Sequence, residues 1–310
     1  MGAGTGRRIA VAVDVGGTKI LAGLVGPRGE VPESRTVPAD PLGGEQVLAQ
    51  VVELVRSLRR AAPAGATITG LGVAVPGAVR ADGTVWAPNL PGWRRVSLGA
   101  HLTRTTGLRA VVRDDRLTSL LGEVWLGAAR NVRSAAFLTI GTGIGLGFMT
   151  EGHFWTGAHG AAGSVGWWAR GRTDAAAAAS RVGALESAVA GPAILRRMRQ
   201  SRIPGASVQD LVSEARRGNR RAQALIDDTA RLIGVTVADV VSMLDPDVVI
   251  VGGGVMQPGR FPLAPLRAAI RTYAQPLARQ VPIRRSALGA RASFLGAAAL
   301  VHRARGHGRA

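Results

Sequence analysis

The chain has 310 residues, of which 46% are hydrophobic, so it is long enough for two domains that each bury a core. It contains no cysteine, which excludes disulfides, thiolate metal sites and a cysteine nucleophile. A formal net charge of +19 would suit a polyanionic partner, but the arginines are scattered along the whole sequence, as on a solvated surface. No signal peptide and no membrane-length apolar run stand out, so we expect a soluble, cytoplasmic protein that binds no membrane.

Residues 9–25 predict a phosphate-binding hairpin. An apolar strand over Ile9–Val13 leads through Asp14 into the Gly16-Gly17 turn, and a second apolar strand follows. The two glycines permit a left-handed backbone and a close approach of anionic oxygens to amide groups. Thr18 adds a hydroxyl, and Lys19, the single lysine beside 38 arginines, adds a cation. The alternative is an ordinary Gly-Gly hairpin whose polar residues face water.

A helix over Val47–Ala61 and a strand over Gly70–Val75 come next. The loop Ala87–Trp93 contains Asn89, and its Trp93 has the simpler interpretation of a hydrophobic plug in a Pro-rich turn. A short strand over Leu108–Val112 then runs into Asp114 and Asp115, ahead of a helix from about Thr118 to Trp125. Two adjacent carboxylates at that point would serve catalysis or cap the helix.

A second glycine-rich turn, Gly141–Gly147, follows the apolar strand Ala135–Ile140. By itself this turn would also fit a bulged hairpin. Further on, helices are expected over Val208–Arg217 and Arg221–Met243. A buried strand then ends in Gly252–Gly254, which we expect at a helix entrance where the backbone approaches a nucleotide closely. A small-residue helix, Phe294–Val301, closes the predicted fold.

Asp14-Val15-Gly16-Gly17-Thr18-Lys19 resembles the first phosphate motif of the ROK family (repressors, open reading frames and sugar kinases) of the hexokinase, actin and Hsp70 ATPase superfamily. Gly141-Thr142-Gly143 resembles its second phosphate loop and Gly252–Gly254 its adenosine motif, and the resemblance extends from about Ile9 to Val301. It implies an α/β fold, the two-domain actin-like ATPase (ribonuclease H-like) fold with an interdomain cleft. The expected domains are a small one, residues 1–113 plus 294–310, and a large one, residues 114–293.

The same resemblance implies site roles. Asp115 matches the general base that takes the proton of the attacking hydroxyl, and Asp14 would hold Mg²⁺ directly or through water. Asn89, Asp114 and Glu186 match substrate-binding positions, although Glu186 would also suit the first turn of a helix, where a carboxylate meets the helix dipole. The residues implied to bind the nucleotide, ATP, are Gly16, Gly17, Thr18, Lys19, Gly141, Thr142, Gly143, Gly252, Gly253 and Gly254.

Two departures concern the substrate side. Ser164 and Trp167 stand where the family has a sugar-binding Glu and a His that touches both sugar and zinc. Trp167 would meet the substrate or merely fill the volume of the lost zinc site. The family's cysteine-rich zinc loop is replaced by Thr173–Ser180, so we expect no zinc and a mobile loop over Arg170–Gly183.

Together these matches predict an ATP- and Mg²⁺-dependent kinase of a sugar or sugar-like hydroxyl, glucokinase-like with an altered sugar site. The alternatives are a kinase of an amino sugar or C7 cyclitol in secondary metabolism, and a non-catalytic sugar-sensing protein. Family repressors carry a winged helix before the first motif, and eight residues precede Ile9 here, so no nucleic-acid partner is expected. A homodimer is expected from the resemblance.

Overall fold

The structure, a computed structural model, describes residues 8–88, 90–169, 182–257 and 259–303. They form two compact units. The first comprises the described parts of Met1–Gly127, Thr156–Ala161 and Arg291–Ala310, and the second those of Ala128–Trp155 and Ala162–Ala290. The first unit therefore extends beyond residue 113, the boundary expected from the sequence, and includes the helix after it.

The first unit is built on a five-stranded sheet of order β3-β2-β1-β4-β7. Its strands are β1 (Arg8–Val15), β2 (Lys19–Val25), β3 (Glu33–Pro38), β4 (Thr67–Val75) and β7 (Ala110–Asp114). β1, β2 and β3 pair antiparallel, whereas β1, β4 and β7 run parallel. A small ribbon of β5 (Ala78–Val79) and β6 (Val85–Trp86) follows β4. The carboxyl ends of the three parallel strands thus meet at one edge of the sheet.

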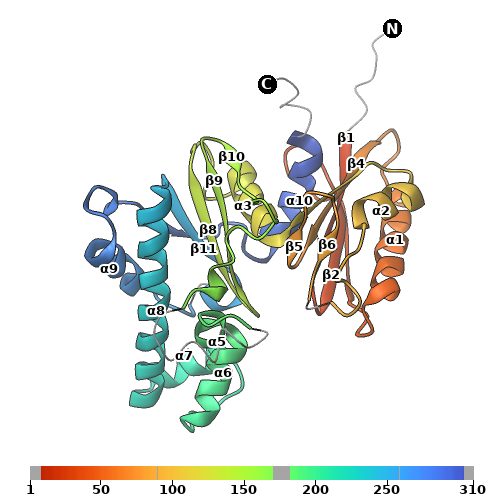
Figure 1. The fold of residues 1–310 in the computed structure, drawn as a ribbon. Helices are drawn as coiled ribbons and strands as arrows, with labels where there is room; N and C mark the ends of the chain where they lie inside the picture. Colours follow the sequence, from red (N-terminus) through yellow and green to blue (C-terminus); the bar gives the residue numbers. More distant parts are fainter. Residues whose placement is uncertain (1–7, 89, 170–181, 258, 304–310) are drawn as a thin grey trace. The chain divides into compact units, whose positions relative to one another are not determined.

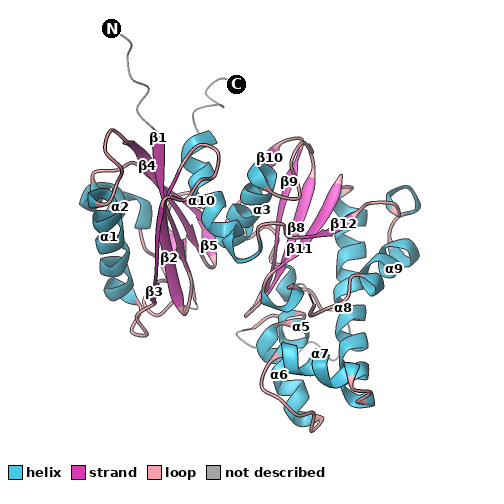
Figure 2. Cartoon of the chain, turned by 180° about the vertical axis from the view of Figure 1, so that it is seen from behind, coloured by secondary structure: helices cyan, strands magenta, loops and turns pink. Residues whose placement is uncertain are grey.

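Helices cover both faces of this sheet (Figures 1 and 2). On one face, α1 (Gly44–Arg60) and α2 (Leu98–Thr106) bury a continuous apolar core with the strands. On the other face, α10 (Ala292–Arg303) packs against β4 and α3 (Asp115–Leu126). This second contact depends on glycine, because a Cβ on Gly72 of β4 would lie 1.8 Å from the carbonyl oxygen of Ala297. The predicted small-residue helix therefore allows backbone-to-backbone packing.

The second unit repeats the sheet topology in the order β10-β9-β8-β11-β12. Its strands are β8 (Ala135–Ile140), β9 (Ile144–Thr150), β10 (His153–Phe154), β11 (Val248–Gly252) and β12 (Ile283–Arg285). The first three pair antiparallel and β8, β11 and β12 run parallel, as in the first unit. This duplication was not visible in the sequence.

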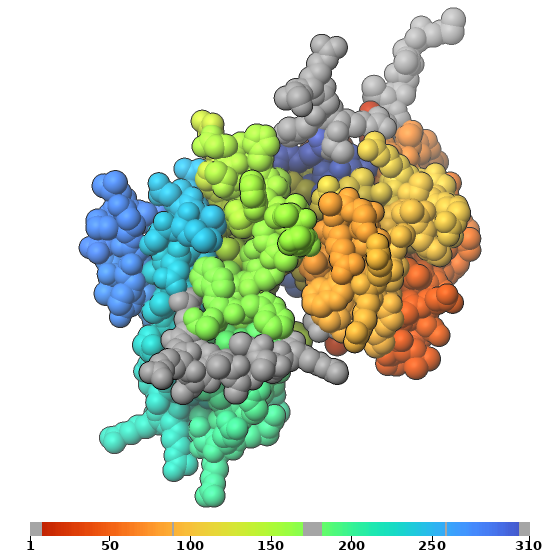
Figure 3. All heavy atoms as spheres, in the orientation of Figure 1, coloured from red at the N-terminus to blue at the C-terminus, as the bar shows by residue number. Residues whose placement is uncertain are grey.

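Five helices of the second unit bury one apolar core with its sheet: α5 (Glu186–Val189), α6 (Gly191–Gln200), α7 (Val208–Arg216), α8 (Arg220–Leu244) and α9 (Ala264–Tyr273). α9 lies beside α8, as the ribbon and space-filling views both show (Figures 1 and 3). Short 3₁₀ turns are η1 (Val165–Trp167), η3 (Gly254–Met256), η4 (Pro276–Ala278) and η5 (Gly289–Arg291). Among the described helices, none is both long and apolar enough to cross a bilayer.

The expected elements agree with these bounds to within a few residues, except after β11. The glycines at its end lead into the single turn η3 and not into a full helix. Gln257, which ends that turn, is extended at φ −58° and ψ 152°. It precedes a proline, and a proline disfavours the helical conformation of the residue before it.

Candidate functional site in two halves

The first unit presents a polar cluster where its parallel strands end. Asp14 of β1 is in register with Ala74 of β4, and Ala74 is in register with Arg113 of β7. Because adjacent strands lie about 4.8 Å apart, Asp14 is about 10 Å from the backbone at the end of β7. Asp115 begins α3 directly after that strand. Two carboxylates 101 positions apart in the sequence are thus brought to one sheet edge.

The turn beside Asp14 leaves its polar groups available. Gly16 closes the turn by donating its amide to the carbonyl of Lys19 at 2.9 Å. A Cβ on Gly16 would lie 2.9 Å from the same oxygen, so the turn requires glycine. Gly17, Thr18 and Lys19 are exposed. Within the described residues, the Thr18 hydroxyl and the Lys19 ammonium make no hydrogen bond, as expected for groups that bind a ligand or face water.

The carboxylate of Asp14 is oriented by a serine from the other end of the chain. Ser293 of α10 donates its hydroxyl to Oδ1 at 3.0 Å, and the Thr118 hydroxyl of α3 lies 3.0 Å from that of Ser293. Burial raises the pKa of Asp14 to about 6, while Ser293 and Lys19 act in the opposite direction. In the described part of the chain Oδ2 of Asp14 has no partner. One oriented carboxylate with a free oxygen fits Mg²⁺, which binds through one or two carboxylates plus phosphate oxygens.

The sequence left helix capping and catalysis open as roles for Asp114 and Asp115, and the contacts of the two side chains differ. Asp114 is the N-cap of α3, since its Oδ1 accepts the Leu117 amide at 3.3 Å. The same oxygen accepts the Arg116 Nε at 2.9 Å in an ion pair whose side chains are 5% and 11% exposed. Arg116 Nη2 also donates to the carbonyls of Gly77 at 3.2 Å and Gly160 at 3.5 Å. Asp114 is therefore the residue that caps α3.

Asp115 is left as the titratable group beside this ion pair. Burial is the main reason that its pKa is raised to about 7, and the negative charge of Asp114 adds to the shift. Arg116 lowers the pKa of Asp115, and Asp14 raises it further. A carboxyl with a pKa near neutrality is suited to accept a proton during catalysis.

In the second unit, the Gly141–Gly143 turn between β8 and β9 is braced from two sides. Gly191, the first residue of α6, donates its amide to the carbonyl of Gly141 at 2.8 Å. Glu186 Oε2 accepts the Ile144 amide at 2.9 Å, and a Cβ on Gly143 would lie 2.6 Å from that oxygen. Glu186 begins the short helix α5 and at the same time fixes the turn.

The glycines after β11 lie next to that turn and differ in how tightly the protein packs around them. Gly253, at φ 85°, is required by packing, since a Cβ there would lie 2.4 Å from the carbonyl oxygen of Ile140. A Cβ on Gly254 would meet nothing nearer than the Arg260 Nη1 at 4.0 Å, and one on Gly141 nothing nearer than the Gly254 nitrogen at 3.7 Å. The packing of the described residues therefore does not itself require glycine at Gly141 or Gly254.

Residues 10–304 match the family model described as the ROK family. The chain belongs to the ROK family. A glucokinase of Thermotoga maritima is 29% identical over 94% of this chain and 96% of its own length. An N-acetylmannosamine kinase of Escherichia coli is 28% identical over 79% of this chain and 82% of its own. The ROK hexokinase structure from Thermus thermophilus superposes with a TM-score of 0.83 at 30% identity, over 97% of this chain and 100% of that one.

The ROK-family glucokinase of Streptomyces griseus, solved with glucose and AMPPNP, has a TM-score of 0.80 at 26% identity, over 95% of this chain and 99% of that one. These likenesses confirm the actin-like ATPase fold.

The positions that depart from the ROK pattern lie around η1. Ser164 precedes this turn, and Trp167 ends it with 51% of its surface exposed. Asn89 and the replacement for the family's zinc loop, Thr173–Ser180, lie outside the described residues. In the described ranges no group of three or more His, Asp or Glu side chains is arranged to hold a metal, and the absence of zinc stays a prediction.

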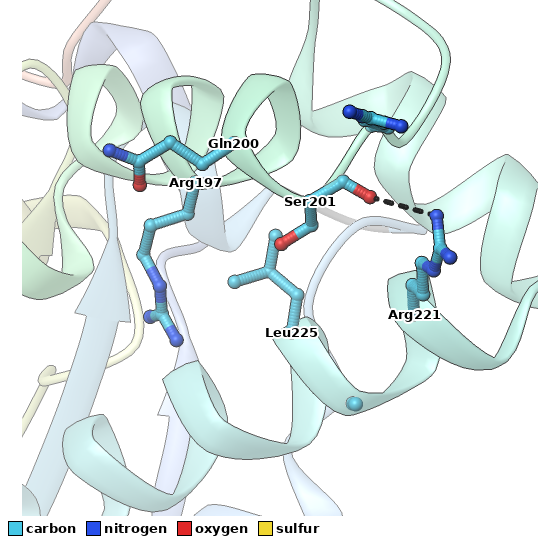
Figure 4. A pocket seen from close by; sticks show the side chains of 7 residues that line it. Arg197, Gln200, Ser201, Arg221 and Leu225 are labelled. Carbon is cyan, nitrogen blue, oxygen red and sulfur yellow. Dashed lines mark hydrogen bonds between the residues drawn. The ribbon is translucent and has the colours of Figure 1, made fainter.

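Another hollow of the second unit, of about 580 Å³, lies between the end of α6 and the start of α8 (Figure 4). Arg221 Nη1 lies 3.5 Å from the carbonyl of Ser201 there, and Arg197 pairs with Asp228. None of the residues predicted for the ROK site lines it.

The sequence analysis did not identify Ser293, Arg116 or Arg260. The one sequence signal available for any of them was the position of Ser293, a serine at the start of a buried apolar helix.

Proposed function

We propose that this ROK protein is an ATP-dependent kinase that transfers the terminal phosphoryl group to a hydroxyl of a sugar or sugar-like substrate. The observation that carries the proposal is the pair of Asp14 and Asp115 at one sheet edge beside an open glycine turn. Phosphoryl transfer requires a phosphate cradle, a metal carboxylate and a base that orients the attacking hydroxyl. The first unit offers a candidate for each: the Gly16-Gly17 turn, Asp14 and Asp115.

Asp115 accepts the proton of the attacking hydroxyl as the new O–P bond forms. Thr18, Lys19 and the amides of the first turn bind phosphate oxygens, and the Gly141–Gly143 turn and Gly252–Gly254 bind the rest of the nucleotide. Asp14 would hold Mg²⁺, which would supply positive charge against the phosphate oxygens.

The substrate clamp consists of Asn89, Asp114 and Glu186, with Ser164 and Trp167 as the altered positions. Asp114 supports a substrate that donates hydrogen bonds, because its Oδ2 has no partner among the described residues and an ionised carboxylate only accepts. Trp167 offers a half-exposed aromatic surface to a less polar edge. This pattern favours an amino sugar, a deoxy sugar or a cyclitol over plain glucose. A cytoplasmic location and a homodimer belong to the same proposal.

A coupled assay of ADP release over a panel of sugars and cyclitols tests the function. We expect substrate-dependent ADP release that requires Mg²⁺ and is lost in Asp115→Asn. Binding of nucleotide and sugar without turnover of any panel member would instead support the non-catalytic sensor. The Asp14→Asn variant should bind Mg²⁺ and MgATP more weakly, which calorimetry measures independently of turnover.

A further inference from the structure

The described residues of the segment after β11, residues 253–257 and 259–261, are held by arginines from two other elements. Arg285 of β12 donates from both terminal nitrogens, to the carbonyls of Met256 and Phe261. Arg216 of α7 donates its Nη2 to the carbonyl of Gly259 at 3.2 Å. Burial, and after it the charge of nearby Arg267, lowers the pKa of Arg285. The described residues of the segment are therefore held by two arginines besides its own.

The guanidinium of the segment's own arginine, Arg260, makes one hydrogen bond to the described part of the chain. Its Nη1 donates to the carbonyl of Gly254 at 2.6 Å, and the residue is partly exposed. A guanidinium carries five N–H donors in a planar fork. Among the described residues, neither Arg260 nor Arg216, Arg267 or Arg285 pairs with a carboxylate. Most donors of Arg260 thus remain available, in a segment with an uncompensated positive charge.

The contact with Gly254 places the guanidinium beside the two glycines that the packing does not require, Gly141 and Gly254. The Arg260 Nη1 is the nearest atom to a Cβ built on Gly254, and the amide nitrogen of Gly254 is the nearest atom to one built on Gly141. Neither Gly141 nor Gly254 has a positive φ, so backbone conformation does not require glycine at either position. Since neither packing nor backbone conformation requires glycine there, the missing side chains fit a ligand that contacts the backbone beside a cation.

We propose that Arg260 is a nucleotide-binding residue whose guanidinium binds the phosphate groups of ATP, the α-phosphate being nearest to the adenosine glycines. The inference rests on the proposed function, since it requires a nucleotide at Gly252–Gly254. Charge-assisted bonds from guanidinium to phosphate are short and often bidentate, and a fork oriented by one carbonyl is prepared for such a bond. A tether to the backbone alone would not require a partly exposed cation, because Arg216 and Arg285 already tether the segment.

Calorimetric binding of ATP, ADP, AMP and adenosine to the full chain separates a phosphate contact from a structural one. The variants are Arg260→Gln and Arg260→Lys, with Arg216→Gln as the matched control that removes a bond to the same segment. We expect Arg260→Gln to weaken ATP, ADP and AMP about 10-fold to 100-fold and to leave adenosine unchanged. Arg260→Lys should recover part of the loss, and Arg216→Gln should change all four affinities less than about threefold.

Equal weakening of AMP and adenosine in Arg260→Gln would overturn the proposal, because the residue would then act on the nucleoside or on the loop. Unchanged ADP and AMP affinity would overturn it as well. Failure of the proposed function alone appears differently: nucleotides would bind without turnover of any panel member, and the effect of Arg260→Gln on their affinities would still be measured. Wild-type protein that bound none of the phosphorylated nucleotides would overturn both conclusions. Matching thermal unfolding curves of wild type and variants would show that the comparison concerns folded protein.

Discussion

The Asp115 carboxyl should impose a pH dependence on phosphoryl transfer, with kcat/KM rising through an apparent pKa near 7. The sign follows from the role, because only the ionised carboxylate accepts the proton of the attacking hydroxyl. Below the pKa, each unit of pH should lower kcat/KM about tenfold. The profile should level off above about pH 8, where the carboxylate is fully ionised.

Two neighbours should move this profile in opposite directions. Asp114→Asn removes the like charge that raises the pKa of Asp115, so its profile should shift to lower pH. Arg116→Gln removes the cation that lowers the same pKa, so its profile should shift to higher pH. A single nearby charge typically moves a carboxyl pKa by about 1 unit or more. The expected separation between the two variants is therefore about 2 pH units.

The measurement is kcat/KM from pH 5.5 to about 9 with coupling enzymes in excess. Saturating Mg²⁺ keeps Asp14, whose pKa is raised to about 6, in its ionised form so that its titration does not overlap. Because bound Mg²⁺ would also offset the Asp14 charge that raises the pKa of Asp115, the apparent pKa should lie at or below about 7. A wild-type profile that is flat between pH 6 and about 8, or shifts of the same sign in both variants, would refute the assignment of Asp115 as the base.

Four further outcomes follow from the structure. Asp115→Asn should lower kcat by about 10² to 10⁴ with ATP affinity near wild type, and full activity would leave Asp115 a purely structural residue. Because Trp167 replaces a polar side chain of the family's substrate site, glucose should be a poorer substrate than amino sugars, deoxy sugars or cyclitols. Glucose emerging as the best substrate in steady-state kinetics would contradict this reasoning. Elemental analysis of untagged protein should find no stoichiometric zinc. Gly296→Ala should lower the free energy of unfolding by about 1–3 kcal/mol, because its Cβ would lie 1.7 Å from the Thr118 carbonyl oxygen. Denaturant melts measure this loss. Gly99→Ala is the matched control, because a Cβ there would make ordinary contacts at 3.5 Å.

The local pattern of the sequence determined most of the elements. Alternating and continuous apolar runs located β1, β8 and α8, because burial imposes period 2 or 3.6 on neighbouring positions. The glycine pair at residues 16–17 located the first turn, which requires glycine at Gly16 because a Cβ there would lie 2.9 Å from the Lys19 carbonyl oxygen. The resemblance to the ROK motifs then supplied roles for Asp14 and Asp115 that periodicity does not contain.

Tertiary structure alone decided which side chains meet. The register of β1, β4 and β7 brings Asp14 and Asp115 to one edge, and the return of α10 brings Ser293 to Asp14 across 279 positions. It also assigned the helix cap to Asp114 and set Arg260 beside Gly254. Such contacts depend on strand order and helix packing, which a local pattern of apolar and polar residues does not encode, because any order of the same strands buries the same side chains.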